Sequence, residues 1–114
     1  MIFTKSVSTI NPDKTYYCFY IKFSKSGFSR KIAPVPCYIE EIRVDFYKLY
    51  WDEEKTKELG TCCDFSDYTT YSGVYETFEE CVKAYNSAID SRVEQITNTY
   101  NSHLDKLVKN IIKI

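Results

Sequence analysis

The sequence predicts an α+β fold: a small antiparallel sheet of about four strands (residues ~2–72), followed by a long C-terminal amphipathic helix or helical pair (residues ~77–112). In the first half, apolar and polar residues alternate with period two, and from Thr77 onward the spacing changes to threes and fours. The aromatic share of 17% lets a short chain bury a large area. A length of 114 residues fits a single domain, residues 1–114.

Four segments carry the strand pattern: residues 15–23, 28–33, 37–51 and 59–65. In the first, TYYCFYIKF, one face holds Tyr17, Phe19, Ile21 and Phe23 and the other holds Tyr16, Cys18, Tyr20 and Lys22. The short SKSG loop after it predicts a hairpin with 28–33.

The links between these strands carry breaking signals. Pro34 and Pro36 are expected to interrupt pairing, because proline donates no backbone hydrogen bond. The alternation blurs at YKLYW, residues 47–51, which indicates a bulge or burial on both faces. The polar residues 66–73 are expected to be irregular.

From Phe78 to Ile111, apolar residues recur in steps of three and four and form one helical stripe. Thr77 with Glu80 is a capping-box pattern that marks the start. Residues 97–102, TNTYNS, are poor helix formers, so a helical hairpin turning there is the alternative. We favour one long helix, because the stripe keeps its phase through 97–102 and that segment lacks Gly and Pro.

Such a helix is too long for the sheet. About 36 residues span roughly 54 Å, whereas a strand of eight residues spans about 27 Å. The stripe therefore needs further cover, and a homodimer or another protein partner is expected to provide it. The mean step of about 3.67 residues indicates straight or slightly right-handed helix packing. The candidate interface residues are Tyr100, Leu104, Leu107, Val108, Ile111 and Ile112.

Charge is uneven along the chain. Residues 1–36 hold six bases and one acid, residues 37–80 hold four bases and 12 acids, and residues 81–114 hold five bases and three acids. The basic hairpin beside tyrosines resembles a platform for single-stranded nucleic acid. Its candidate residues are Tyr16, Tyr20, Lys22, Lys25, Arg30 and Lys31. The pI near 5.8 opposes this role, so nucleic-acid binding is the alternative function.

No catalytic, cofactor-binding or metal-binding residues are predicted. The five cysteines lack the spacing of a zinc site, and the adjacent Cys62 and Cys63 would point to opposite faces of a strand. His103 is the only histidine, and its pairing with a cysteine would make a cysteine-dependent enzyme, the second alternative. We expect reduced, structural thiols instead.

The composition, rich in Lys, Ile and Tyr, resembles that of proteins from AT-rich bacteria and their phages. Residues 1–14 form no long apolar segment, and no run of about 18 apolar residues occurs. We therefore expect a cytoplasmic protein, in the host cell if phage-encoded, that makes no membrane contact. The predicted function is non-enzymatic: a small interaction protein that binds another protein, as a phage accessory or inhibitor protein would.

Overall fold

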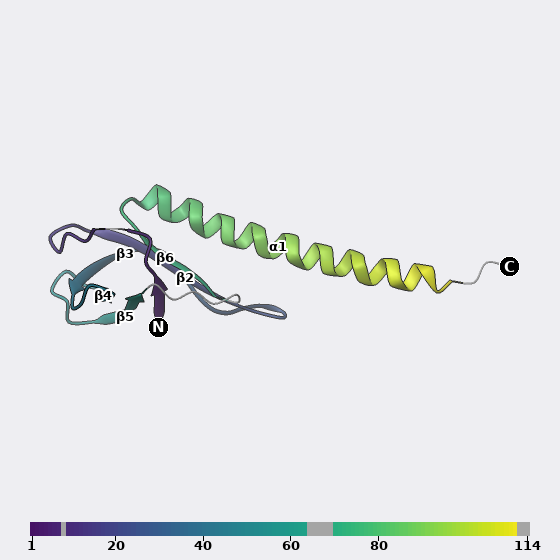
Figure 1. Ribbon diagram of the computed structural model, residues 1–114, viewed down its shortest axis with the longest axis horizontal. Coiled ribbons are helices and arrows are strands. Elements are labelled where there is room, and N and C mark those ends of the chain that lie inside the picture. The colour runs from purple at the N-terminus through teal and green to yellow at the C-terminus, as the bar shows by residue number, and fades with distance from the viewer. Residues whose placement is uncertain (8, 64–69, 112–114) are drawn as a thin grey trace.

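The structure is a computed structural model that describes residues 1–7, 9–63 and 70–111. It contains β1 (Ile2–Thr4), β2 (Tyr16–Ser24), β3 (Gly27–Glu41), β4 (Phe46–Tyr50), β5 (Glu58–Cys63), β6 (Thr70–Tyr75) and α1 (Phe78–Lys109). All strands gather at one end of the molecule, and α1 runs from them as an arm (Figure 1). The molecule measures 73 × 24 × 23 Å along its principal axes.

The strands form one curled sheet in the order β1-β5-β4-β3-β2-β6. Neighbours are antiparallel except β1 and β5, which are parallel. The two outer strands meet at a seam that serine hydroxyls bridge: the Thr4 N–H donates to Ser72 Oγ at 3.0 Å, and the Val74 N–H donates to Ser6 Oγ at 3.3 Å. The sheet is therefore nearly a closed barrel, with side chains in place of a last backbone ladder.

The prediction of about four antiparallel strands was wrong, because the described residues contain six strands and one parallel pair. β1 has only three residues, too few to show a period. β6 overlaps the segment 66–73 that was expected to be irregular, of which 66–69 lie outside the described residues. Gly73 suits the seam rather than a turn, because a Cβ there would lie 2.6 Å from Tyr75 Oη and 2.8 Å from Ser6 Oγ.

β3 runs through both prolines and Pro36 pairs with Tyr17, so the interruption of pairing expected over both is confined to Pro34. The pairing of β2 with β3 shifts register there and leaves an extra β3 residue, which is a bulge, where proline is tolerated. The segment predicted as one strand, 37–51, is divided between the end of β3 and β4. Of the two options for YKLYW, burial on both faces is confirmed, because the adjacent Leu49 and Tyr50 are both buried. The register shift beside them leaves the extra residue on β5, at Leu59, and not in YKLYW.

Two apolar clusters hold the fold together. The first fills the barrel and includes Phe3, Tyr16, Cys18, Cys37, Ile39, Leu49, Cys62 and Val74. The second lies between the outer face of the sheet and α1, with Phe19, Ile21, Cys81 and Ala88 at its centre. β2 supplies both clusters, so both faces of this strand are buried, as its apolar and aromatic content on either side allows.

α1 is a single unbroken helix of 32 residues, about 48 Å long, so the long helix favoured from the sequence is confirmed over the hairpin. Thr77 caps it as predicted, because its side-chain oxygen accepts the Glu80 N–H at 3.2 Å. Within the weak segment 97–102, Thr99 donates its hydroxyl to the Gln95 carbonyl at 2.9 Å. The threonine hydroxyl is thus satisfied without ending the helix.

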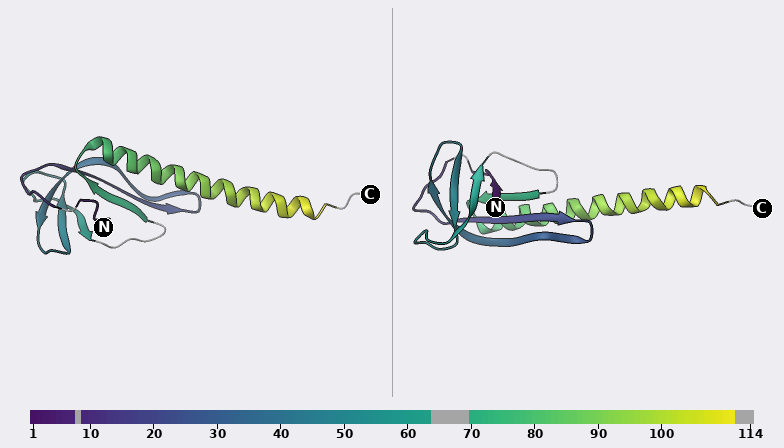
Figure 2. Two further views of the ribbon diagram at one scale, coloured as in Figure 1. Left: turned by 45° about the horizontal axis from the view of Figure 1, so that its top comes forward. Right: turned by 90° about the horizontal axis from the view of Figure 1, so that it is seen from below.

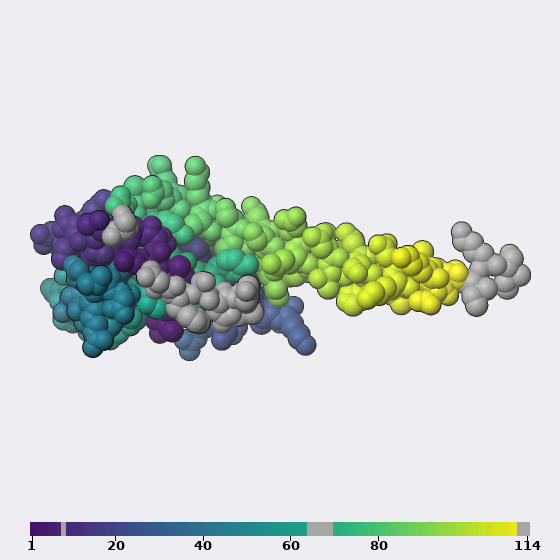
Figure 3. Space-filling view, in the orientation of Figure 1, coloured from purple at the N-terminus to yellow at the C-terminus, as the bar shows by residue number. Residues whose placement is uncertain are grey.

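Only the first half of α1 contacts the sheet, along β2, β3 and β6. Beyond Arg92 every described helical residue is exposed. The two rotated views show α1 following the β2–β3 hairpin and then passing beyond its end (Figure 2). In the space-filling view the second half of α1 projects clear of the body (Figure 3). The sheet therefore covers part of the helix, as its length predicted.

Candidate protein-interaction surface

The most prominent exposed apolar surface of the described residues is a stripe on the projecting half of α1, composed of Val93, Ile96, Tyr100, Leu104 and Leu107, and Ile111 follows it just beyond the end of the helix. These side chains are 40–68% exposed, and the equally exposed Val108 lies beside them. Of the predicted interface residues, Tyr100, Leu104, Leu107, Val108 and Ile111 belong to this surface, and Ile112 lies outside the described residues. Val93 and Ile96 were missing from the prediction, although their spacing already placed them on the same face.

The stripe is not the side of α1 that meets the sheet. The helical residues that the sheet buries are small, Cys81 and Ala88. Val82 and Ile89 each follow one of them, and a step of one residue turns about 100° around a helix. The stripe therefore runs along the flank of the packed half and continues onto the arm. Small residues let α1 lie close to the aromatic floor, where the Phe19 and Tyr85 rings meet edge-to-face at 5.8 Å.

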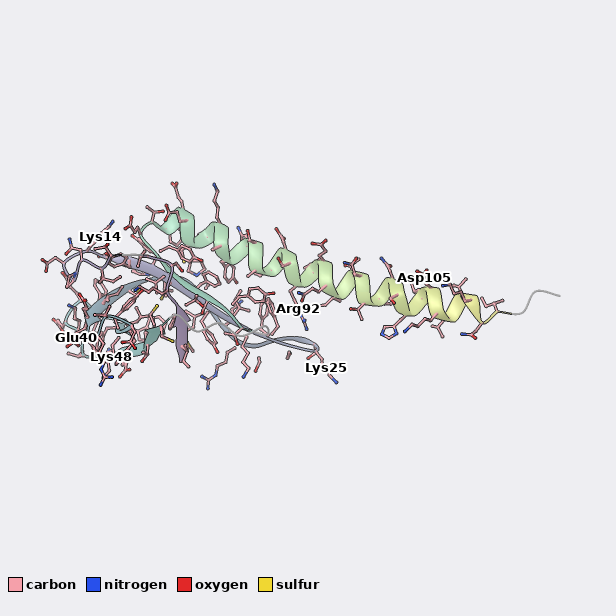
Figure 4. All side chains as sticks on the ribbon, in the orientation of Figure 1. Lys14, Lys25, Glu40, Lys48, Arg92 and Asp105 are labelled. Carbon is pink, nitrogen blue, oxygen red and sulfur yellow. The ribbon has the colours of Figure 1, made fainter. Side chains whose placement is uncertain are left out.

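Arg92 marks the point where α1 leaves the sheet. Its Nη2 donates to the Ser24 carbonyl at 3.1 Å, and its guanidinium lies 5.5 Å from the Phe23 ring centroid. Figure 4 shows this side chain pointing from the helix toward the end of the hairpin, where Lys25 lies. The contact ties the tip of the hairpin to the helix and sets the direction of the arm.

A shallow cavity of about 350 Å³ continues outward from this contact, lined by Lys25, Arg92, Ile96, Tyr100 and His103 among others. His103 is exposed here, and no cysteine lines the cavity with it. The hypothesis of a cysteine–histidine pair thus gains no geometric support at this site.

A larger groove of about 720 Å³ lies on the other flank of α1, against β6. Ala84 and Ser91 of the helix face Tyr71 and Tyr75 of the strand across it. The described residues that line it contribute hydroxyl groups, one amide and apolar carbon but no charged side chain. These residues do not indicate a particular small ligand.

The residues predicted to bind nucleic acid do not form one platform. Tyr16 is buried inside the barrel, where its hydroxyl oxygen accepts the Asn11 N–H at 2.8 Å. Lys22 and Arg30 face each other across β2 and β3, on the face of the half-buried Tyr20. Lys31 pairs with Ile21 and so lies on the opposite, helix-covered face. Nucleic-acid binding by this hairpin remains an untested prediction, with its basic residues divided between two faces.

None of the five cysteines forms a disulfide, and Cys63 alone among them is not fully buried. A hydrogen bond with Cys37, followed by burial, raises the pKa of the Cys18 thiol. Burial raises the pKa of the Cys81 thiol to about 12. These thiols stay protonated at neutral pH and are poor nucleophiles. Within the described residues, no three His, Cys, Asp or Glu side chains gather to hold a metal ion.

Alkaline pH is expected to destabilise the fold. In the unfolded chain Cys81 ionises near its ordinary pKa of 9.0, whereas in the folded chain it keeps its proton to about 12. The folded state thus holds more protons in this window, and the free energy of unfolding falls as pH rises, by up to about 1.4 kcal/mol per pH unit for each such thiol. Urea unfolding at several pH values above 9 measures the slope. Cys81→Ala should make it shallower, and an identical slope would contradict this assignment.

Comparisons with protein-family models, with curated proteins and with solved structures found no match to this chain. No helix in the described part of the chain combines the length and the apolar content that crossing a membrane requires.

Proposed function

We propose that this chain is a small non-enzymatic interaction protein that binds another protein along the apolar stripe of α1. One observation carries the proposal: five large apolar side chains, each at least 40% exposed, lie on one face of a helix that the sheet leaves uncovered, and the exposed Ile111 follows them. Fully burying one such side chain contributes roughly 1.5–3 kcal/mol, less where it is already half covered. Contiguous apolar surface of this kind is rare on monomers and marks interaction sites.

The shape of the surface indicates the kind of partner. The stripe is narrow, and polar uncharged residues such as Thr97, Asn98 and Asn101 lie around it. A second helix fits such a surface, because its own apolar stripe covers the first while its other faces stay in water. A partner that buried the whole circumference of the arm would also bury these polar groups, at a cost in free energy.

The test is a single substitution with a matched control. Leu107→Asp places a charge within the stripe, and Asn98→Asp adds the same charge on the far side of the helix. Tagged forms of the wild type and of both variants are each produced in cells that naturally make the protein. A wild-type copy with a different tag is produced beside each of them, so that binding to a second copy can also be detected. Each tagged form is then recovered with whatever protein is bound to it. We expect the wild type and Asn98→Asp to retain the same bound protein and Leu107→Asp to lose it. Equal recovery by all three would refute binding through the stripe.

A further inference from the structure

The spacing of the stripe is symmetric about one residue. From Ile89 to Ile111 the apolar positions lie at steps of 4, 3, 4, 4, 3 and 4 residues, with Tyr100 at the centre. The same steps are read from either end. Within α1, which ends at Lys109, the helix can therefore lie antiparallel to a copy of itself with each apolar residue from Val93 to Leu107 opposite another apolar residue. We propose that the partner is a second copy of this chain, paired antiparallel with a two-fold axis at Tyr100; this rests on the proposed function.

Under this symmetry each apolar side chain of the stripe lies opposite an apolar side chain of the partner copy. Tyr100 lies against the partner copy's Tyr100, Val93 is level with Leu107, and Ile96 is level with Leu104. The repeat of 4, 3 and 4 residues adds up to 11 residues in three turns, close to the 3.6 per turn of a straight helix. Two copies therefore stay in contact without strong supercoiling. A second copy of this chain has the same 11-residue spacing of apolar residues, whereas an unrelated helix would need to have acquired that spacing independently.

Charge favours the antiparallel direction. Between Ile89 and Tyr100 the acids Asp90 and Glu94 outnumber the single base, Arg92. From Tyr100 to the helix end at Lys109 the bases Lys106 and Lys109 outnumber the single acid, Asp105. An antiparallel pair lays the basic half of each helix beside the acidic half of the other, and the two helix dipoles oppose each other favourably. A parallel pair would align like halves.

The body of the molecule leaves room for this arrangement. From Val93 to Ile111 every described residue is exposed, and the stripe points about 100° away from the side that the sheet covers. Pairing about Tyr100 sets the end of the partner's helix, Lys109, level with Ser91, two residues beyond Ile89, which is partly buried at the edge of the helix–sheet contact. The two sheets then lie at opposite ends of the pair. An antiparallel register one 11-residue repeat deeper would place the partner's helix end over the sheet, beside Phe78.

Disulfide trapping in the purified full-length protein tests the geometry. Tyr100→Cys, Val93→Cys and Leu107→Cys are each oxidised with diamide, denatured, and run without reductant, with wild type and Asn98→Cys as controls for the native cysteines. We expect Tyr100→Cys to cross-link to itself in most chains. When each is oxidised by itself, Val93→Cys and Leu107→Cys should run as uncross-linked chains. When the two variants are mixed before oxidation, they should form a cross-linked dimer with one another.

Three results would overturn the proposal. Self-cross-linking of Val93→Cys and Leu107→Cys as strong as that of Tyr100→Cys would indicate a parallel pair. If the mixture of Val93→Cys and Leu107→Cys gives no more cross-linked dimer than either variant alone, this register is excluded. Absence of any cross-link above wild type would exclude a second copy. In that last case, recovery of another protein that still depends on Leu107 would leave the proposed function standing with a different partner.

Discussion

Replacing Phe3 with alanine is expected to lower the free energy of unfolding by about 3–5 kcal/mol. Phe3 is fully buried in the barrel cluster, and its ring lies 5.8 Å from that of Tyr20. It anchors β1, a strand of three residues that pairs with β5 and meets β6 at the serine seam. The total free energy of unfolding of a small domain is about 5–15 kcal/mol, so this substitution removes a large fraction of its stability. Urea denaturation followed by tyrosine fluorescence measures it.

The neighbouring residue supplies the control. Ile2 lies in the same strand but on the outward face and is 48% exposed, so Ile2→Ala should cost under about 1 kcal/mol. Equal losses for the two variants would mean that β1 does not close the barrel as described.

The double substitution Leu104→Asp/Leu107→Asp is expected to unwind the arm. Without the partner helix, every residue from 93 to 109 is exposed, and of the described residues only the hairpin end at Lys25 lies beside the start of this segment. A helix of about 17 residues with many Thr, Asn and Ser is marginal in water. Amide hydrogen exchange should show loss of protection across 93–109, by roughly tenfold or more for each 1.4 kcal/mol of pairing free energy removed. Residues 78–91 should keep their protection, because they pack on the sheet.

Asn98→Asp/Asn101→Asp carries the same charge change outside the stripe and should leave exchange close to that of the wild type. If both double variants exchange alike, the arm is stable by itself and pairing does not hold it.

The sequence predicted the elements whose patterns are local. The stripe and the Thr77 cap located α1, and the alternation in 15–23 located β2. β6 could not be found in this way, because a segment with Gly73 and Ser72 becomes a strand only through its pairing with β2 and the close approach at the seam. The passage of β3 through Pro34 likewise depends on a bulge that exists only in the paired sheet.

The candidate surface was predictable in part. Its residues follow from helical spacing, and the excess of helix length over strand length indicated that the sheet would leave them uncovered. The sequence pattern did not predict which side of α1 the sheet buries. Cys81 and Ala88 lie on that side, and they are less apolar than their neighbours Val82 and Ile89. The small residues win the sheet contact because the floor beneath them is already filled by bulky aromatic rings.

The basic hairpin shows the opposite outcome. Alternation placed Tyr16, Tyr20 and Lys22 on one face correctly, yet that face enters the barrel at Tyr16 and emerges to solvent at Lys22. Curvature of the sheet along β2, which a single strand pattern does not reveal, separates the ends of the predicted platform.

The most direct test of the central claim is the mass of the wild-type protein in solution, measured by sedimentation equilibrium over a wide range of concentration. The claim that a second copy covers the stripe predicts a mass approaching twice 13.4 kDa as concentration rises, with Leu104→Asp/Leu107→Asp remaining at the mass of one chain. A wild type that stays at 13.4 kDa over the whole range would contradict it.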